Sequence, residues 1–241
     1  MNILIITGGS KGIGKALAQK YHSENYTVFS IARSELENCS YIQIAADLSN
    51  LNAAVNAMCT IFSQIDASTV ANITLINNAG TLGTINTLGN LDPENIAQAI
   101  QLNTTTPLVL SNEFIRLTKG WKASKQIINI SSGAATNPYQ GWSVYCTSKA
   151  ALDMTTKVIA AEQNDIENGV KCTSIYPGVV DTHMQTAIRK TPKTNFKNVQ
   201  RFIDLKNNNE LYAPSFVADS IFTIDTENQL ENGAIVDIRK L

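Results

Sequence analysis

The chain has 241 residues, of which 44% are hydrophobic, and its formal net charge at pH 7 is −1. This length and composition suit an α/β protein with a sizeable buried core. Lys and Arg are spread along the sequence rather than clustered, which argues against a nucleic-acid-binding surface and a polybasic membrane anchor.

Metal binding and membrane insertion are not expected either. The two histidines are isolated and the four cysteines show no metal-ligand spacing, so we expect reduced thiols and no metal site. The apolar run that opens the chain is short and leads directly into a glycine motif, which indicates a strand rather than a signal peptide. No stretch has the length and apolar character of a membrane span, so we expect a soluble, cytoplasmic protein.

Short apolar runs alternate with longer amphipathic segments along the whole chain. The pattern predicts strands at residues 2–6, 27–32, 41–45, 73–77, 125–131, 170–175 and 234–237. It predicts helices at residues 12–24, 50–65, 93–118, 143–167, 183–190, 196–207 and 214–225. Such alternation is typical of a parallel sheet covered on both faces. We therefore expect an α/β fold, a doubly wound sheet of about seven strands in a single domain spanning residues 1–241.

A glycine-rich segment, residues 7–14, lies between the first expected strand and the first expected helix. Glycines allow a tight turn and let the backbone approach a pyrophosphate, while the start of a helix offers free N–H groups and a positive dipole end. The sequence therefore predicts a nucleotide-binding loop. Its expected contact residues are Gly8, Ser10, Lys11, Gly12, Ile13 and Gly14.

The residues after the second expected strand indicate which nucleotide is bound. An acidic residue here would bind the ribose hydroxyls of NAD, but the sequence has Arg33 and Ser34. The Arg33 guanidinium can pair with a 2′-phosphate, and Lys11 adds positive charge, so we expect NADPH; an ordinary surface arginine is the alternative. The connection 33–40 is too short for a crossover helix, so we expect a loop or single turn that leaves this flank thinly covered.

Three further strand ends carry residues suited to the same ligand. Asp47 can bond the adenine, and the small residues at 78–80 let the backbone approach the adenosine. Ligands of open α/β sheets collect at the carboxyl ends of the strands, so these segments should converge on one crevice. The expected cofactor contacts here are Asp47, Leu48, Asn78, Ala79, Gly80, Pro177, Gly178, Val180 and Thr182.

Tyr145 and Lys149 are one turn apart in an expected helix, so both side chains should lie on one face. A Lys ammonium next to a phenol stabilises the phenolate and should lower the pKa of Tyr145. Ser132, just after the strand 125–131, can meet that phenol across a substrate carbonyl. The arrangement predicts hydride transfer to a carbonyl, with Tyr145 as general acid and Ser132 as donor to the oxyanion. A solvated helix surface is the alternative.

Asn103 and Pro107 lie four residues apart in the expected helix 93–118. Proline has no N–H, so in an α-helical register the Asn103 carbonyl would lose its partner. We expect a kink and a free carbonyl that can hold a water in contact with Lys149. An ordinary proline kink without a function is the alternative.

In this order and spacing, the motifs resemble those of the short-chain dehydrogenase/reductase family over essentially the whole chain. The resemblance rests on residues 7–14, Asn-Asn-Ala-Gly at 77–80, Asn103, Ser132, Tyr145-x-x-x-Lys149 and Pro177-Gly178. It implies a Rossmann-type fold and a catalytic tetrad of Asn103, Ser132, Tyr145 and Lys149. It also implies that Tyr145 and Lys149 contact the nicotinamide ribose.

A narrower resemblance is to the sepiapterin reductase branch, and within it to the bacterial benzil reductases. It rests on residues 129–132, Gly141-Trp142 before Tyr145, and residues 178–185, 188–191 and 232–239. It implies NADPH-dependent reduction of one carbonyl of a 1,2-diketone to an α-hydroxy ketone. Asp237 matches an Asp that anchors the pterin in sepiapterin reductases, and it either contacts substrate or is an inherited structural residue. The expected substrate contacts are Ser132, Tyr139, Trp142, Tyr145, Met184, Gln185 and Asp237.

The segment 183–212 is longer than a loop between a strand and a helix needs, which indicates a lid over the substrate. Its apolar side chains, Phe196, Val199, Phe202 and Leu205, can equally pack a helix pair onto the domain. The family commonly forms homodimers or homotetramers through the helices at about 93–118 and 143–167, and the apolar positions here permit that assembly.

Two other functions stay open. The first is an NAD(P)-dependent alcohol dehydrogenase for another hydroxy or keto substrate, such as a hydroxysteroid or a fatty-acyl intermediate. The second is a non-catalytic NADPH-sensing protein that binds a partner, although such proteins usually lose the Tyr or Lys that this sequence keeps.

Overall fold

The computed structural model describes residues 1–227 and 230–241. Within these residues the centre is a seven-stranded parallel sheet in the order β3-β2-β1-β4-β5-β6-β7. The strands are β1 (Asn2–Thr7), β2 (Thr27–Ala32), β3 (Ile42–Ala45), β4 (Asn72–Asn77), β5 (Ser124–Ile130), β6 (Lys171–Tyr176) and β7 (Ile235–Asp237). The expectation of a doubly wound parallel sheet is confirmed.

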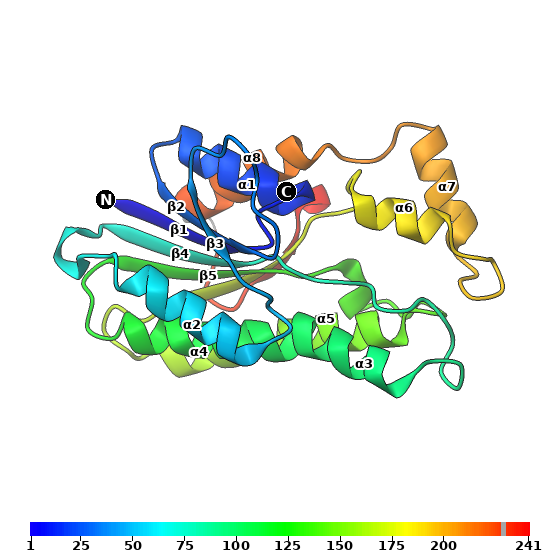
Figure 1. Ribbon diagram of the computed structural model, residues 1–241, viewed down its shortest axis with the longest axis horizontal. Helices are drawn as coiled ribbons and strands as arrows, with labels where there is room; N and C mark the ends of the chain where they lie inside the picture. The colour runs from blue at the N-terminus through cyan, green and yellow to red at the C-terminus, as the bar shows by residue number, and fades with distance from the viewer. Residues whose placement is uncertain (228–229) are drawn as a thin grey trace.

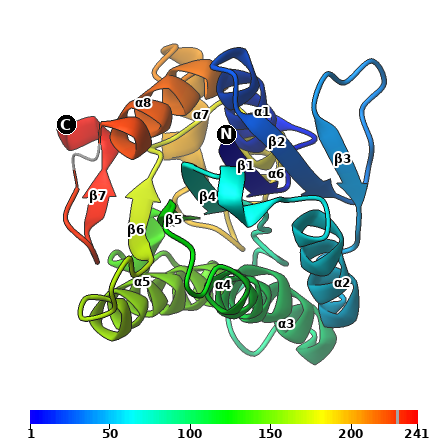
Figure 2. The ribbon, with the colours of Figure 1, turned by 90° about the vertical axis from the view of Figure 1, so that its left-hand side faces the viewer.

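Helices cover both faces of this sheet (Figure 2). On one face lie α1 (Gly12–Ser23) and α8 (Pro214–Thr226), and on the other lie α2 (Leu51–Phe62), α4 (Thr106–Leu117) and α5 (Ser143–Gln163). The remaining helices are α3 (Pro93–Ile100), α6 (His183–Arg189) and α7 (Val199–Asn207), together with the short η1 (Ala67–Thr69), η2 (Gln101–Thr105), η3 (Gly133–Ala135) and η4 (Ile238–Lys240). The expected strands and helices are present, with ends that differ by a few residues.

Alternation along the strands builds the two halves of the core. In β1, Ile3 and Ile5 face the cluster beneath α2 and α4, whereas Leu4 and Ile6 face the cluster beneath α1 and α8. All four are fully buried, and each contributes about 1.5–3 kcal/mol relative to an exposed side chain. The carboxyl ends of the strands point towards the part of the molecule that carries α6 and α7 (Figure 1).

The connection between β2 and β3 contains no helix, as its length predicts. It is held instead by the side chain of Gln43, which accepts a hydrogen bond from Leu36 N at 2.6 Å and donates one to Leu36 O at 2.9 Å. The side chains of β3 are all exposed or only partly buried, so this flank of the sheet is thinly covered. No helix among the described residues is both long and apolar enough to span the hydrocarbon core of a membrane.

Candidate active site

Three segments at the carboxyl ends of the strands bring the expected tetrad together. Asn103 lies in η2, Ser132 follows β5, and Tyr145 and Lys149 lie on α5. Asn103, Tyr145 and Lys149 are only 1%, 8% and 5% exposed. The Ser132 hydroxyl is near enough to Tyr145 to favour its phenolate, and Lys149 Nζ lies 5.7 Å from the centroid of the Tyr145 ring. The solvated-surface alternative for Tyr145 and Lys149 is therefore wrong.

A network through Thr81 and Ser148 fixes Asn103 relative to α5. The Asn103 amide donates to Thr81 O at 2.7 Å and accepts from Thr81 N at 2.8 Å. It also donates to Ser148 Oγ at 3.1 Å, and Ser148 Oγ donates to the carbonyl of Tyr145 at 2.8 Å. Sequence reasoning missed Thr81 and Ser148, although Thr81 directly follows the Asn-Asn-Ala-Gly motif.

The helical segment around Asn103 contains a π-turn rather than the expected kinked α-helix. In η2 the N–H of Thr106 donates to the carbonyl of Gln101, a spacing of five residues. The argument that Pro107 alone removes the partner of Asn103 assumed an α-helical register, and that assumption is wrong. Pro107 has no N–H, so this position offers no main-chain hydrogen-bond donor to the carbonyls of the preceding turn. A relay water at Asn103 stays a prediction.

Burial is the largest cause of the pKa shifts of both Tyr145 and Lys149. It raises the pKa of Tyr145 to about 12, although the nearby Ser132 hydroxyl opposes the shift. It lowers the pKa of Lys149 to about 8, with the nearby charge of Asp153 opposing the shift. Lys149 Nζ donates to the carbonyl of Ile130 at 2.7 Å. The expectation of a lowered pKa for Tyr145 is therefore wrong, because desolvation of the phenol is the largest effect on it.

The glycine loop is packed so closely against its neighbours that side chains would not fit at two of its glycines. A Cβ on Gly14 would lie 2.3 Å from the carbonyl oxygen of Gly8, and one on Gly9 would lie 2.2 Å from Ser30 Oγ. Gly8 and Gly12 have φ values of +71° and +55°, a region that favours glycine. At the start of α1, no side chain of the described residues caps the helix and the first turn contains no acidic residue. The loop therefore fits a pyrophosphate on the helix N-terminus.

Side-chain amides join the glycine loop to the end of β4, and β4 to β5. Asn78 donates through its side chain to the carbonyl of Thr7 at 2.9 Å, and Thr7 Oγ1 accepts from the N–H groups of Asn78 and Ala79. Asn77 donates to Asn129 Oδ1 at 2.9 Å, which ties β4 to β5.

The residues expected to contact the adenosine lie at one edge of the site. Arg33 and Ser34 are exposed after β2. The Arg33 charge lowers the pKa of Asp47, behind the larger effect of hydrogen bonds from Ser49. The Leu48 side chain is buried in the core, and its carbonyl accepts a hydrogen bond from Thr106 Oγ1. A cofactor could therefore contact Leu48 only through the rest of the Leu48 main chain.

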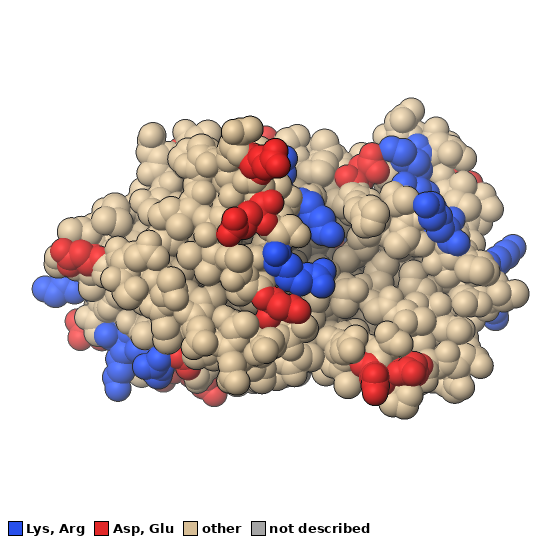
Figure 3. Space-filling model, viewed as in Figure 1, with Lys and Arg blue, Asp and Glu red and all other residues tan. Residues whose placement is uncertain are grey.

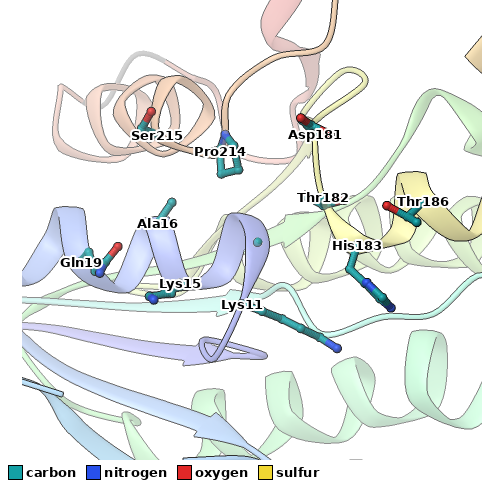
Figure 4. A pocket seen from close by; sticks show the side chains of 11 residues that line it. Lys11, Lys15, Ala16, Gln19, Asp181, Thr182, His183, Thr186, Pro214 and Ser215 are labelled. Atoms are coloured by element: carbon teal, nitrogen blue, oxygen red, sulfur yellow. The ribbon is translucent and has the colours of Figure 1, made fainter. Parts of the chain in front are cut away.

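A pocket of about 700 Å³ connects the glycine loop with the segment after β6 (Figure 4). Lys11 and Lys15 extend from the start of α1, opposite Thr182 and His183. Val180 is buried in the core beneath α1 and α8, so its side chain does not line this pocket. Figure 3 shows Lys and Arg side chains beside the hollow near the centre of the same face. No cluster of three or more potential metal ligands occurs in the described parts of the chain.

The segment 183–212 packs onto the domain through aromatic rings. Trp142, only 6% exposed, stacks on Phe196 with ring centroids 4.6 Å apart and contacts Phe202 at 5.4 Å. Its ring also meets Tyr145 edge-on at 5.6 Å. The expectation that apolar side chains of this segment pack its helices onto the domain is confirmed. Trp142 therefore mainly holds this segment beside Tyr145, and only a small part of its surface can face a substrate.

The other expected substrate contacts lie around the same cluster. Tyr139 contacts Trp142 at a centroid distance of 5.0 Å and accepts a hydrogen bond from Arg201 of α7 at 3.0 Å. Met184 packs against the cluster, and Gln185 is buried with an Oε1 that lacks a partner among the described residues. Asp237 forms an ion pair with Arg239, which sequence reasoning did not assign to the site.

Comparisons with known proteins agree with this geometry. The model of a family described as short chain dehydrogenase matches residues 2–193. Benzil reductase ((S)-benzoin forming) of Bacillus subtilis (strain 168) is 39% identical over 100% of this chain and 99% of its own. Sepiapterin reductase of Meriones unguiculatus is 31% identical over 98% and 95%. The crystal structure of the KRED1-Pglu enzyme superposes with a TM-score of 0.87 at 26% identity, covering 98% of this chain and 100% of that one.

Proposed function

This chain belongs to the short-chain dehydrogenase family and is an oxidoreductase, and from that premise we propose that it is an NADPH-dependent reductase of 1,2-diketones. The product is an α-hydroxy ketone. The observation that carries the proposal is the convergence of Ser132, Tyr145 and Lys149 at the strand ends that also present the glycine loop. The full-length likeness to a benzil reductase supports the substrate class.

The tetrad residues supply the proton and stabilise the charge. Tyr145 donates its proton to the carbonyl oxygen as general acid. Ser132 donates a hydrogen bond to the same oxygen, a type of contact often worth about 3 kcal/mol in the transition state. Lys149 keeps a positive charge next to the phenolate that forms on Tyr145, and Asn103 fixes the surrounding main chain through Thr81. A bound NADPH supplies the hydride for the carbonyl carbon.

The protonation of the site favours reduction. Burial keeps the pKa of Tyr145 at about 12, so the phenol holds its proton at neutral pH and is ready to donate it. Oxidation of an alcohol needs the phenolate as base, and burial of Tyr145 disfavours that charged form. The alternative of an alcohol dehydrogenase that works mainly as an oxidant fits this environment less well.

The cofactor would lie across the carboxyl ends of the strands. The glycine loop would bind the pyrophosphate, and Arg33 with Lys11 would bind the 2′-phosphate. Tyr145 and Lys149 would hold the nicotinamide ribose. The other proposed contacts are Ser34, Asp47, Leu48, Asn78, Ala79, Gly80, Pro177, Gly178, Val180 and Thr182, with Leu48 and Val180 acting through their main chains.

We also propose that the chain is one domain and that residues 183–212 cover the substrate. Tyr139, Met184 and Gln185 would line the substrate side. The chain would assemble as a homodimer or homotetramer through α4 and α5, which carry the exposed apolar residues Leu108, Met154 and Val158. Sedimentation velocity of the native protein, compared with a Met154→Lys variant, tests this assembly.

The function is tested by oxidation of NADPH with benzil, followed by loss of absorbance at the NADPH band. Tyr145→Phe should lower kcat by about 10²–10⁴ because the general acid is lost, while NADPH binding measured by fluorescence is retained. Tyr26→Phe, which removes a hydroxyl near the opposite ends of the strands, is the control and should keep wild-type turnover. Retained turnover in Tyr145→Phe would refute the catalytic assignment. Wild-type protein that binds NADPH but reduces no carbonyl substrate would favour the sensing alternative.

A further inference from the structure

The C-terminal end of the chain places an arginine beside the proposed catalytic serine. Asp237, the last residue of β7, pairs with Tyr176 at the end of β6, and η4 follows. A Cβ on Gly133, the residue after Ser132, would lie 4.0 Å from Arg239 Nη2. A Cβ on Gly178 would lie 3.3 Å from Arg239 Cδ. Arg239 therefore lies over the ends of β5 and β6, on the side where the substrate carbonyl would be.

Asp237 holds this arginine in one orientation. Arg239 Nε donates to Asp237 Oδ1 at 2.8 Å, Nη2 donates to Oδ2, and the main-chain N–H of Arg239 donates to Oδ1 at 3.1 Å. The Asp237 side chain is 9% exposed, whereas that of Arg239 is 41% exposed. Both oxygens of Asp237 are thus in use. Of the five guanidinium N–H donors, three are without a partner in the described structure.

We propose that Arg239, held by Asp237, donates hydrogen bonds to the second carbonyl oxygen of a 1,2-dicarbonyl substrate and thereby selects such substrates over simple ketones. The inference rests on the proposed function and gives that site its specificity-determining residue. A fixed guanidinium edge suits an oxygen acceptor, and a simple ketone has only the one oxygen that Ser132 and Tyr145 would bind.

The surroundings of Arg239 favour a neutral, aromatic partner. The ion pair with Asp237 cancels its net charge, so a neutral carbonyl oxygen is preferred to a carboxylate. The Tyr212 ring lies 2.9 Å from where a Cβ of Gly178 would be, and Tyr139 is near enough to affect Arg239 electrostatically. Asp237 itself is not available as a substrate anchor, because Arg239 occupies its carboxylate. We therefore place the proposed substrate contact at Arg239 rather than at Asp237.

The test compares two substrates that differ in one carbonyl oxygen, benzil and deoxybenzoin, at saturating NADPH. In Arg239→Met, the ratio of kcat/KM for benzil to that for deoxybenzoin should fall about tenfold or more, because a charge-assisted hydrogen bond is lost for benzil alone. Since this variant leaves Asp237 unpaired, the double variant Asp237→Asn/Arg239→Gln removes both charges and should show the same fall. Lys240→Met removes the neighbouring exposed charge and should keep the wild-type ratio.

The outcomes separate this inference from the proposed function. A fall in the ratio in both arginine variants, with NADPH binding retained, supports the role of Arg239. Equal losses for both ketones, or an unchanged ratio, would overturn that role while wild-type turnover of benzil still supports the proposed function. Wild-type protein that fails to reduce any 1,2-diketone would overturn both.

Discussion

Replacing Asp153 with Asn is expected to shift the pH profile of carbonyl reduction without abolishing the reaction. Asp153 lies one turn after Lys149 on α5, is buried, and accepts a hydrogen bond from Tyr176. Burial lowers the pKa of Lys149 to about 8, and the charge of Asp153 offsets part of that shift. Without the carboxylate, the pKa of Lys149 should fall further, so the ammonium loses its proton at a lower pH.

The size of the shift follows from the spacing on the helix. Residues at i and i+4 have Cβ atoms about 5–6 Å apart, and two unit charges at about 6 Å interact by about 3 kcal/mol at an effective dielectric constant of about 20. That energy corresponds to about two pKa units. With a pKa of about 8, roughly 90% of Lys149 is protonated at pH 7, and with a pKa near 6 only about 10% is. The rate at pH 7 should therefore fall about tenfold, and the two enzymes should converge near pH 5.

The assay is kcat/KM for benzil between about pH 5 and 9.5, at constant ionic strength and saturating NADPH. Wild-type activity should fall above about pH 8, as Lys149 loses its charge, and in Asp153→Asn this fall should begin at lower pH. Asp165→Asn, which removes an exposed carboxylate just after α5, is the control for net charge. An alkaline limb at the wild-type pH, or an equal loss at every pH, would refute the reasoning.

Three further results are expected. Arg33→Asp should raise the KM for NADPH about 10- to 100-fold with little change for NADH, and equal effects would refute the 2′-phosphate contact. Gly141→Ala should raise the substrate KM more than the NADPH Kd, because its φ is +91° and a Cβ would lie 2.1 Å from the carbonyl oxygen of Asn195 in the 183–212 segment. Burial raises the pKa of Asp225 to about 6, so the native state holds its proton above the unfolded pKa. From about pH 3 to 7, urea unfolding should show wild-type stability falling by about 3 kcal/mol relative to Asp225→Asn, with most of the fall between about pH 4 and 6.

The sheet and the main catalytic groups could be predicted because each depends on local pattern. Short buried runs rich in β-branched residues, such as those of β1 and β4, favour strands, and parallel strands bring their carboxyl ends to one edge. The spacing of Tyr145 and Lys149 gives a shared helix face whatever the tertiary packing. The glycine loop needs only its position between a strand and a helix.

The features that sequence reasoning missed have two origins. Some depend on contacts between residues far apart in the sequence, and one depends on whether a helix takes an α- or a π-helical hydrogen-bond pattern. The π-turn at Asn103 could not be distinguished from an α-helix with a proline, because both leave a main-chain donor missing. The direction of the Tyr145 pKa shift was wrong because sequence reveals the lysine but not the depth of burial. A substrate contact of Trp142 was expected from its position before Tyr145, yet its ring is buried and packs against Phe196 and Phe202, which lie far along the chain.

The charges near the proposed carbonyl site cancel in pairs, which bears on the choice between neutral and anionic substrates. The Lys149 ammonium lies near the Asp153 carboxylate, and Arg239 is bonded to Asp237. A carboxylate or phosphate on the substrate would find no uncompensated cation at these positions, whereas an uncharged diketone needs only hydrogen-bond donors there. Lys11 and Lys15, by contrast, line the pocket at the glycine loop, where the cofactor phosphates would lie. This separation of charge favours a neutral substrate at one end of the cleft and an anionic cofactor at the other.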